Sequence, residues 1–312
     1  MQMGAAMALS VRLVAMLPTA GLVLVPGRVQ AQEAVAATGA GAEMGRHVFW
    51  RLDKLAGGQL FLLGSLHFGD ERLYPLPDVV EQAYQSCGTV VFETDLRLTR
   101  QPEFSEMMRR KAELMPPATV ADTLTPAALA AFREAARGLG VEPAWLERYR
   151  AWYCANQLMS VALRRAGVEP MRGIDQVFCT RTSNDGKAVG TLETPEFQVD
   201  LFAGLADAQA AALLTESLAE VAQVREFVER MLGAYLRGDL VALEELITAS
   251  FDGVPELRRR FLTDRNAAWM EPLQGLSRQP GSHLVVVGTG HLLGEDGLVA
   301  RLRRAGLTVT RL

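Results

Sequence analysis

The sequence lacks several patterns that define common enzyme classes. It contains no G-x-S-x-G, no H-E-x-x-H and no Gly-rich phosphate loop. Their absence argues against serine hydrolases, standard zinc peptidases and nucleotide-binding proteins. The chain also has no run of more than three basic residues and no interleaving of basic and aromatic residues. We therefore expect no nucleic-acid partner.

Cysteine is scarce and the cysteines are widely spaced. Cys87, Cys154 and Cys179 form no C-x-x-C pair. At most one disulfide can form within the chain, and one thiol must then be left over. We expect buried free thiols, and a thiolate metal site has no support.

Acidic residues are absent from the first 31 positions. Arg12 and Arg28 are the only charged residues there, an apolar segment runs from 13 to 25, and residues 29–31 read Val-Gln-Ala. This small-x-small ending is typical of a signal peptide. The alternative is an uncleaved anchor, but thirteen residues are too few to span a bilayer. We predict that residues 1–31 are a signal peptide and that the protein is periplasmic or secreted.

The remainder of the chain divides into a leader and one domain. Residues 32–45 are rich in Ala, Gly and Glu and are expected to be a flexible leader. Without residues 1–31 the chain keeps 30 of its 32 basic residues against 36 acidic ones, a net charge of −6. Residues 46–312 are long enough for one large domain, with a helical middle at about 102–280. We expect no stable membrane span after cleavage.

The pattern G-x-x-H occurs twice, once near each end of this domain. The first copy is Gly64-Ser65-Leu66-His67 and the second is Gly288-Thr289-Gly290-His291. Each follows an apolar run suited to a buried strand, and each precedes a helical stretch and a further strand, at 89–93 and 307–309. Open α/β folds build ligand sites at the carboxyl edge of the sheet. We predict a mixed α/β sheet built from two related strand-GxxH-helix-strand units, with both histidines at one edge.

The glycines of these motifs have a physical reason. Gly64 and Gly288 allow a sharp exit from each strand, and Gly290 would let the backbone approach a ligand closely.

Glu93 is the third candidate of this site, because it directly follows the apolar strand residues 90–92. Two imidazoles and a carboxylate are a common ligand set for a divalent transition metal such as manganese, cobalt or zinc. Alternatively, each histidine satisfies a structural role, and Glu93 caps a helix or pairs with an arginine.

Two further clusters carry charged residues. Asp175, Glu193 and Glu196 lie around a predicted central strand, and Arg265 lies with Asn266 and Trp269 in a predicted helix. Arg265 could bind a substrate carboxylate or orient Glu93. Helix capping and ordinary ion pairs are the alternative interpretations.

These segments together resemble the TraB/GumN family, to which the Tiki metalloproteases also belong. The resemblance covers nearly the whole predicted domain, in the family's order. It rests on residues 63–67 and 91–95, Gly173-Ile174-Asp175, Leu192-Glu193-Thr194 with Glu196 and Gln198, Arg265-Asn266 with Trp269, and residues 288–292.

The resemblance implies a fold related to the erythromycin esterase and ChaN groups. It also implies an active site made of the two G-x-x-H motifs and the acidic residue, and for the Tiki branch a divalent-metal-dependent peptidase. Carried over by position, His67, Glu93 and His291 form the site, with Arg265 and Glu193 in supporting roles. The family names specify no reaction.

The leading hypothesis is an exported metal-dependent hydrolase that acts on a peptide bond. His67 and His291 would bind the metal, Glu93 would be the third ligand or the general base, and Arg265 would stabilise the developing oxyanion. One alternative is a non-catalytic periplasmic binding protein for a peptide or a haem-like ligand. Another is an accessory scaffold in polysaccharide export, in which the histidines are structural.

Overall fold

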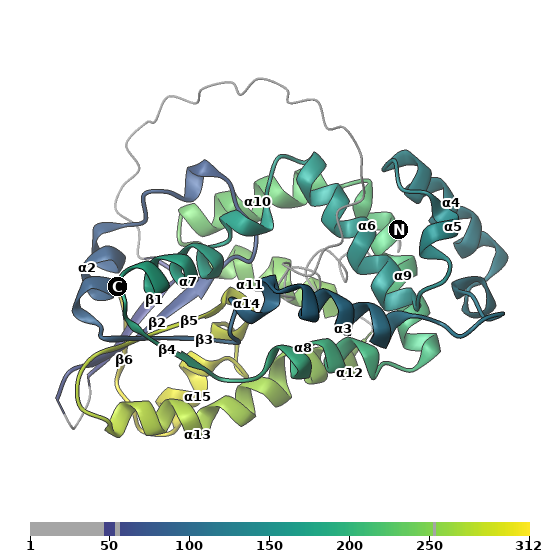
Figure 1. The fold of residues 1–312 in the computed structure, drawn as a ribbon. Coiled ribbons are helices and arrows are strands. Elements are labelled where there is room, and N and C mark those ends of the chain that lie inside the picture. The colour runs from purple at the N-terminus through teal and green to yellow at the C-terminus, as the bar shows by residue number, and fades with distance from the viewer. Residues whose placement is uncertain (1–46, 54–56, 252–253) are drawn as a thin grey trace.

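The structure is a computed structural model that describes residues 47–53, 57–251 and 254–312. The predicted signal peptide and leader lie outside the described residues. The described part is α/β with a six-stranded mixed sheet, which confirms the predicted class (Figure 1). No helix within these ranges is both long enough and apolar enough to cross a bilayer.

The sheet has a parallel centre and an antiparallel edge. Its strand order is β4-β3-β5-β2-β1-β6, and β2, β5, β3 and β4 run parallel to one another. β1 pairs antiparallel with both β2 and β6. The strands are β1 (Phe49–Asp53), β2 (Gln59–Ser65), β3 (Thr89–Phe92), β4 (Ala188–Thr191), β5 (His283–Gly288) and β6 (Val309–Arg311).

Most α-helices of the described residues lie between β3 and β5, with β4 among them, whereas α2 precedes β3 and α14 and α15 follow β5. The α-helices are α2 (Asp78–Ser86), α3 (Pro102–Ala112), α4 (Pro126–Gly138), α5 (Pro143–Leu146), α6 (Ala151–Arg165), α7 (Ile174–Asn184), α8 (Pro195–Ala203), α9 (Asp207–Val221), α10 (Val224–Leu236), α11 (Leu240–Thr248), α12 (Pro255–Arg258), α13 (Asp264–Arg278), α14 (Thr289–Leu292) and α15 (Leu298–Arg304). Between α12 and α13 lies a π-helical turn, η7 (Arg259–Thr263). Short 3-10 turns are η2 (Glu71–Leu73), η3 (Leu98–Arg100), η4 (Val120–Thr123), η5 (Pro170–Arg172) and η6 (Ala249–Phe251).

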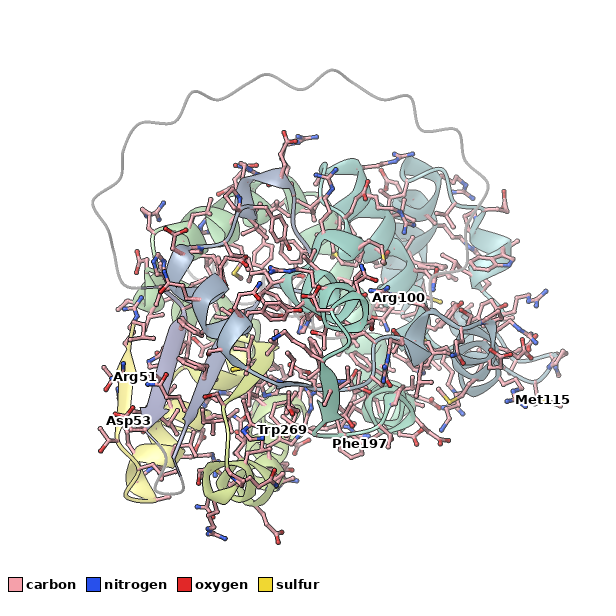
Figure 2. All side chains as sticks on the ribbon, turned by 60° about the vertical axis from the view of Figure 1, so that its left-hand side comes forward. Arg51, Asp53, Arg100, Met115, Phe197 and Trp269 are labelled. Carbon is pink, nitrogen blue, oxygen red and sulfur yellow. The ribbon has the colours of Figure 1, made fainter. Side chains whose placement is uncertain are left out.

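Many of the helices between β3 and β5 lie beside the sheet rather than on its faces (Figure 1). Figure 2 shows Arg51 and Asp53 of β1 at one end of the molecule and Met115, after α3, at the other. In Figure 1, α2 and α7 lie on one side of the sheet, and α13 and α15 lie on the other. The carboxyl ends of the four parallel strands point towards the helices that lie beside the sheet.

Local signals in the sequence explain where several helices begin. The hydroxyl oxygens of Thr125 and Thr194 accept hydrogen bonds from the third backbone N–H of α4 and α8, each at 3.2 Å. A proline follows each threonine, where its missing N–H costs no helical bond. Both helices therefore begin at a Thr-Pro pair, a local signal that is visible in the sequence.

The chain from Pro143 to Gly167 does not form one continuous helix. It forms α5 and α6, with an extended segment around Tyr149 between them. There the backbone N–H of Arg150 donates to the carbonyl of Ala112 at 2.8 Å, and Tyr149 forms an antiparallel bridge with Glu113. This pairing with the segment after α3 replaces continuous helix.

The two G-x-x-H segments both follow strands, but their surroundings differ. After the first, the chain returns through α2 to β3, which pairs parallel with β5. After the second, it returns through α15 to β6, which pairs antiparallel with β1. The sheet is mixed because β1 runs opposite to both of its neighbours, β2 and β6.

Aromatic residues around the start of α6 lie in the core, as do the thiols that we predicted to be buried. Tyr149, Trp152 and Tyr153 are each at most 1% exposed. All three cysteines are buried, and they form no disulfide with one another.

Candidate active site

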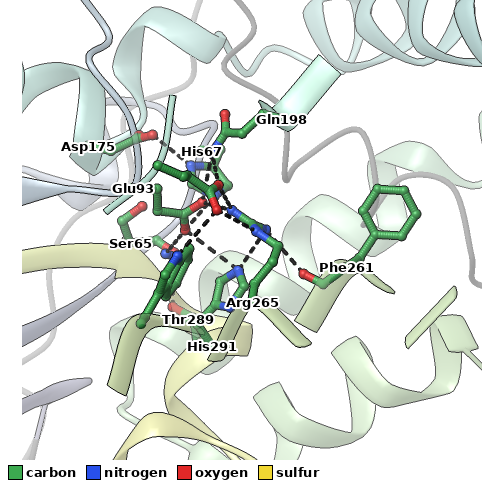
Figure 3. Close-up of polar contacts among 12 residues, drawn as sticks. Ser65, His67, Glu93, Asp175, Gln198, Phe261, Arg265, Thr289 and His291 are labelled. Atoms are coloured by element: carbon green, nitrogen blue, oxygen red, sulfur yellow. Dashed lines mark hydrogen bonds and ion pairs between the residues drawn. The ribbon is translucent and has the colours of Figure 1, made fainter. Parts of the chain in front are cut away.

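The parallel centre of the sheet brings the predicted residues to one place. Each of its four strands leads directly into a polar side chain at the same edge, where α7 and α13 add two more (Figure 3). These six residues are His67, Glu93, Glu193, His291, Asp175 and Arg265. The register explains the meeting, because Ser65 of β2 and Gly288 of β5 are paired.

The ring of His67 is held by Asp175. Nδ1 lies 2.6 Å from Asp175 Oδ2, so this nitrogen donates to the carboxylate. Nε2 is buried without a hydrogen-bond partner among the described residues and lies 3.8 Å from Glu93 Oε1. The first turn of α7 is anchored here, since the N–H of Ile174 donates to the carbonyl of Leu66 at 3.0 Å.

The ring of His291 is held by two neighbours from α13. Arg265 lies 3.0 Å from Nε2, and Asn266 Oδ1 lies 2.7 Å from Nδ1. A guanidinium can only donate, so Nε2 accepts and Nδ1 carries the hydrogen. Nε2 also lies 3.8 Å from Glu93 Oε1. Burial, together with the charge of Arg265, lowers the pKa of His291 to about 3, so the ring is neutral.

Arg265 joins the two carboxylates. Its guanidinium is 2% exposed and donates to Glu93 Oε2 at 2.7 Å and to both oxygens of Glu193. It also donates to the carbonyl of Phe261 in the π-helical turn at 3.1 Å. Such wide turns often occur at functional sites. The buried positive charge is thus matched by carboxylates on two strand ends.

The electrostatics of Glu93 and His67 follow from these contacts. Burial alone would raise the pKa of Glu93, but Arg265 and the two imidazoles lower it to about 2. Burial alone would lower the pKa of His67, but Asp175 and Glu93 outweigh it and raise that pKa. Glu93 is therefore ionised at neutral pH.

Glu193 is held from three sides, although burial raises its pKa more than Arg265 lowers it. Besides Arg265, its oxygens accept from Gln198 at 2.7 Å and from the indole N–H of Trp269 at 3.2 Å. Gln198 also donates to Glu93 at 3.3 Å. Glu193 therefore supports Arg265 from the side away from His67.

Gly288 keeps the space between these groups open. Its N–H donates to Glu93 Oε1 at 2.6 Å. A Cβ at this position would lie 2.9 Å from His67 Nε2 and 3.2 Å from Glu93 Oε1. Gly290 lines the cavity beside the histidines, and an added Cβ there would lie 3.1 Å from Ile247 of α11.

The two motifs are also joined by residues that sequence reasoning did not select. The Thr289 hydroxyl donates to the carbonyl of Ser65 at 3.0 Å, and the Tyr235 hydroxyl of α10 donates to that of Gly64 at 2.6 Å. Ser65 and Thr289 occupy the same place in the two motifs, and this repeated hydroxyl was a detectable signal. No pattern in the sequence around Tyr235 indicated that this residue would contact the first motif.

One predicted residue lies apart. Glu196 has a side chain that is 63% exposed and pairs with Lys111 at 3.2 Å. It belongs to the surface of α8, as the alternative interpretation had it.

A metal site is not preformed. Within residues 47–53, 57–251 and 254–312, no three His, Cys, Asp or Glu side chains form a group that could hold a metal ion. Arg265 gives one physical reason, because it uses the Nε2 lone pair of His291. The donor set nevertheless suits a divalent metal. Both Nδ1 atoms are fixed by oxygen acceptors, as is usual for metal-binding histidines, His67 Nε2 is unpartnered, and a glycine keeps the centre free.

Comparison with known proteins agrees with this order of motifs. The sequence pattern of the TraB/PrgY/gumN family matches residues 48–311. The chain belongs to this family.

Two relatives carry the same descriptive name, uncharacterized protein YbaP. The one from Escherichia coli (strain K12) is 24% identical over 262 residues, which cover 83% of this chain and 94% of the relative. The one from Shigella flexneri is 23% identical over 242 residues, which cover 78% and 87%. No solved structure matches the chain.

Proposed function

We propose that this TraB/PrgY/gumN family member is an exported, divalent-metal-dependent hydrolase that acts on a peptide bond. One observation carries the proposal. The Nε2 atoms of His67 and His291 each lie 3.8 Å from the same oxygen of Glu93. Because both Nδ1 atoms are engaged, the two Nε2 atoms and the carboxylate converge on one point.

His67, His291 and Glu93 would hold the metal. When bound, the metal would lower the pKa of a water molecule and polarise the carbonyl of the substrate. Asp175 and Asn266 orient the two rings. Glu93 Oε1 is either the third ligand or the acceptor of the water's proton. For His291 to act as a ligand, Arg265 must release it, while Glu193 still holds the guanidinium in place. Arg265 then donates to the oxyanion that develops on the substrate.

The proposal keeps two finer expectations from the sequence. Export rests on the acid-free, apolar residues 1–31. A fold related to the erythromycin esterase and ChaN groups rests on the family resemblance.

The space beside the histidines favours a hydrolase over a haem-binding protein. The cavity there has a volume of about 40 Å³. By this measure a water molecule needs roughly 10–15 Å³. A few waters fit, whereas a porphyrin does not.

The first experiment is the metal content of the purified protein, measured by elemental mass spectrometry after loading with manganese, cobalt or zinc and dialysis. We expect about one metal per chain, lost in a His67→Ala/His291→Ala variant that circular dichroism shows to be folded. His47→Ala is the matched control, because His47 lies outside the site.

Metal in the parent and the control but not in the double variant supports the site and warrants a peptidase screen. No metal in any of them refutes the metallohydrolase and favours the binding protein. A double variant that loses stability but still supports polysaccharide export in cells favours the accessory scaffold, in which the histidines are structural.

A further inference from the structure

The cavity beside the histidines has an apolar wall built by two helices. Phe227 and Met231 of α10 and Ile247 of α11 form this wall, opposite the two G-x-x-H segments. Phe227, Met231 and Tyr235 are four residues apart, so they share one face of α10. The bond from Tyr235 to the carbonyl of Gly64 fixes this face against the first motif.

The second helix fixes the other side of the wall. Ile247 lies against Gly290, where an added Cβ would come within 3.1 Å of its Cγ2. α11 packs on α14, which carries His291. Both halves of the wall are thus held at a set distance from the imidazoles.

Polar atoms without partners line the same cavity. Ser65 Oγ and His67 Nε2 are buried, and neither has a hydrogen-bond partner within the described part of the chain. An unsatisfied buried polar atom is unfavourable unless water or a ligand completes it. These two atoms therefore point to a ligand that presents polar groups beside an apolar one.

The volume sets the size of that apolar group. About 40 Å³ accommodates roughly three water-sized heavy atoms. An alanine or valine side chain meets this limit, whereas the seven carbons of a benzyl group exceed it.

We propose that this cavity is the subsite for a small aliphatic side chain, of alanine to valine size, on the substrate residue next to the cleaved bond. The inference rests on the proposed function for the identity of that bond. Met231 and Ile247 are the specificity-determining residues, and Ser65 Oγ donates to or accepts from the substrate backbone.

The test uses metal-free protein in EDTA, so that it is independent of metal binding and turnover. The N-acetyl methylamides of alanine, valine and phenylalanine are titrated while NMR follows the imidazole signals of His67 and His291. These signals are assigned with the single histidine variants. We expect the alanine and valine probes to shift both signals and to bind at least about tenfold more tightly than the phenylalanine probe.

Met231→Ala should admit the phenylalanine probe and abolish this preference. Met108→Ala is the matched control, because Met108 is 5% exposed and Met231 is 4% exposed, and Met108 does not line the cavity. Ile247→Val, which removes one methyl group, should shift the preference from alanine towards valine if Met231→Ala does not fold.

Equal shifts from all three probes, shifts from none, or an unchanged preference in the enlarged variants would overturn the subsite. Absence of metal binding, measured separately, would overturn the proposed function instead.

Discussion

Arg265 donates a hydrogen bond to Nε2 of His291 at 3.0 Å, the nitrogen through which this ring would bind a metal. One lone pair cannot serve both partners. In the metal-free protein the Arg265 guanidinium occupies this nitrogen. The same guanidinium forms ion pairs with Glu93 and Glu193.

This relationship predicts the behaviour of Arg265→Gln. Without a metal, the variant leaves two buried carboxylates uncompensated, and we expect it to lose about 3–5 kcal/mol of unfolding free energy. A divalent metal should restore more stability in the variant than in the parent, because it replaces the missing charge. Thermal unfolding with EDTA and with added manganese, cobalt or zinc measures both effects.

Arg133→Gln is the control, since Arg133 forms a partly exposed pair with Glu147 that is expected to contribute at most about 1 kcal/mol. If a metal stabilises Arg265→Gln and the parent equally, the metal does not replace the charge of Arg265, and this prediction is contradicted.

Gly288→Ala should abolish metal loading while the protein stays folded. The added methyl group would come within 2.9 Å of His67 Nε2 and fill the space between the donors. We expect a stability cost of about 1–3 kcal/mol. Gly275→Ala is the control, because an added Cβ in the middle of α13 meets no atom within 4 Å. Metal content and circular dichroism are measured on both, and normal loading of Gly288→Ala would refute a metal at this point.

Asp175→Asn should weaken metal binding by about 10–100-fold, the usual effect of losing the partner that orients a ligating histidine. The amide can still accept from His67 Nδ1, but it lacks the charge that makes the ring a better donor. Competition with a metal chelator gives the affinity. Asp185→Asn removes a carboxylate at the other end of α7, where it accepts from Tyr84, and should leave the affinity unchanged.

Because the thiols are buried, we expect the free energy of unfolding to decrease at alkaline pH. Burial raises the pKa of Cys154 in the folded protein, while an unfolded thiol ionises near about 8.5. The stability from keeping this thiol neutral is complete below that pH and declines above it. The decline approaches about 1.4 kcal/mol per pH unit for one thiol.

Denaturant unfolding between pH 8 and 10 measures this slope, which should be shallower in Cys154→Ala. At pH 7.5 the three cysteines should react with a thiol reagent only after unfolding. Rapid reaction of the native protein would contradict their burial.

Local patterns in the sequence were enough to predict the strands, the glycine turns and the polar residues at the strand ends. The apolar runs before Gly64, Glu93 and Gly288 are long enough to be buried strands, and parallel strands present the next side chains of the chain at one edge. His67, Glu93 and His291 were foreseeable as neighbours for this reason, whereas Glu193 was joined to them only by the family resemblance. The caps at Thr125 and Thr194 were equally local.

The partners of these residues depend on the tertiary structure alone. The order β4-β3-β5-β2 places the strand before His291 between the strands before Glu93 and His67, and no local pattern encodes strand order. Which nitrogen of His291 accepts, and which carboxylates share Arg265, depend on α13 packing beside that edge. The apolar wall of α10 and α11 likewise exists only because distant segments meet, since a helix's own sequence shows an apolar face but not what that face covers.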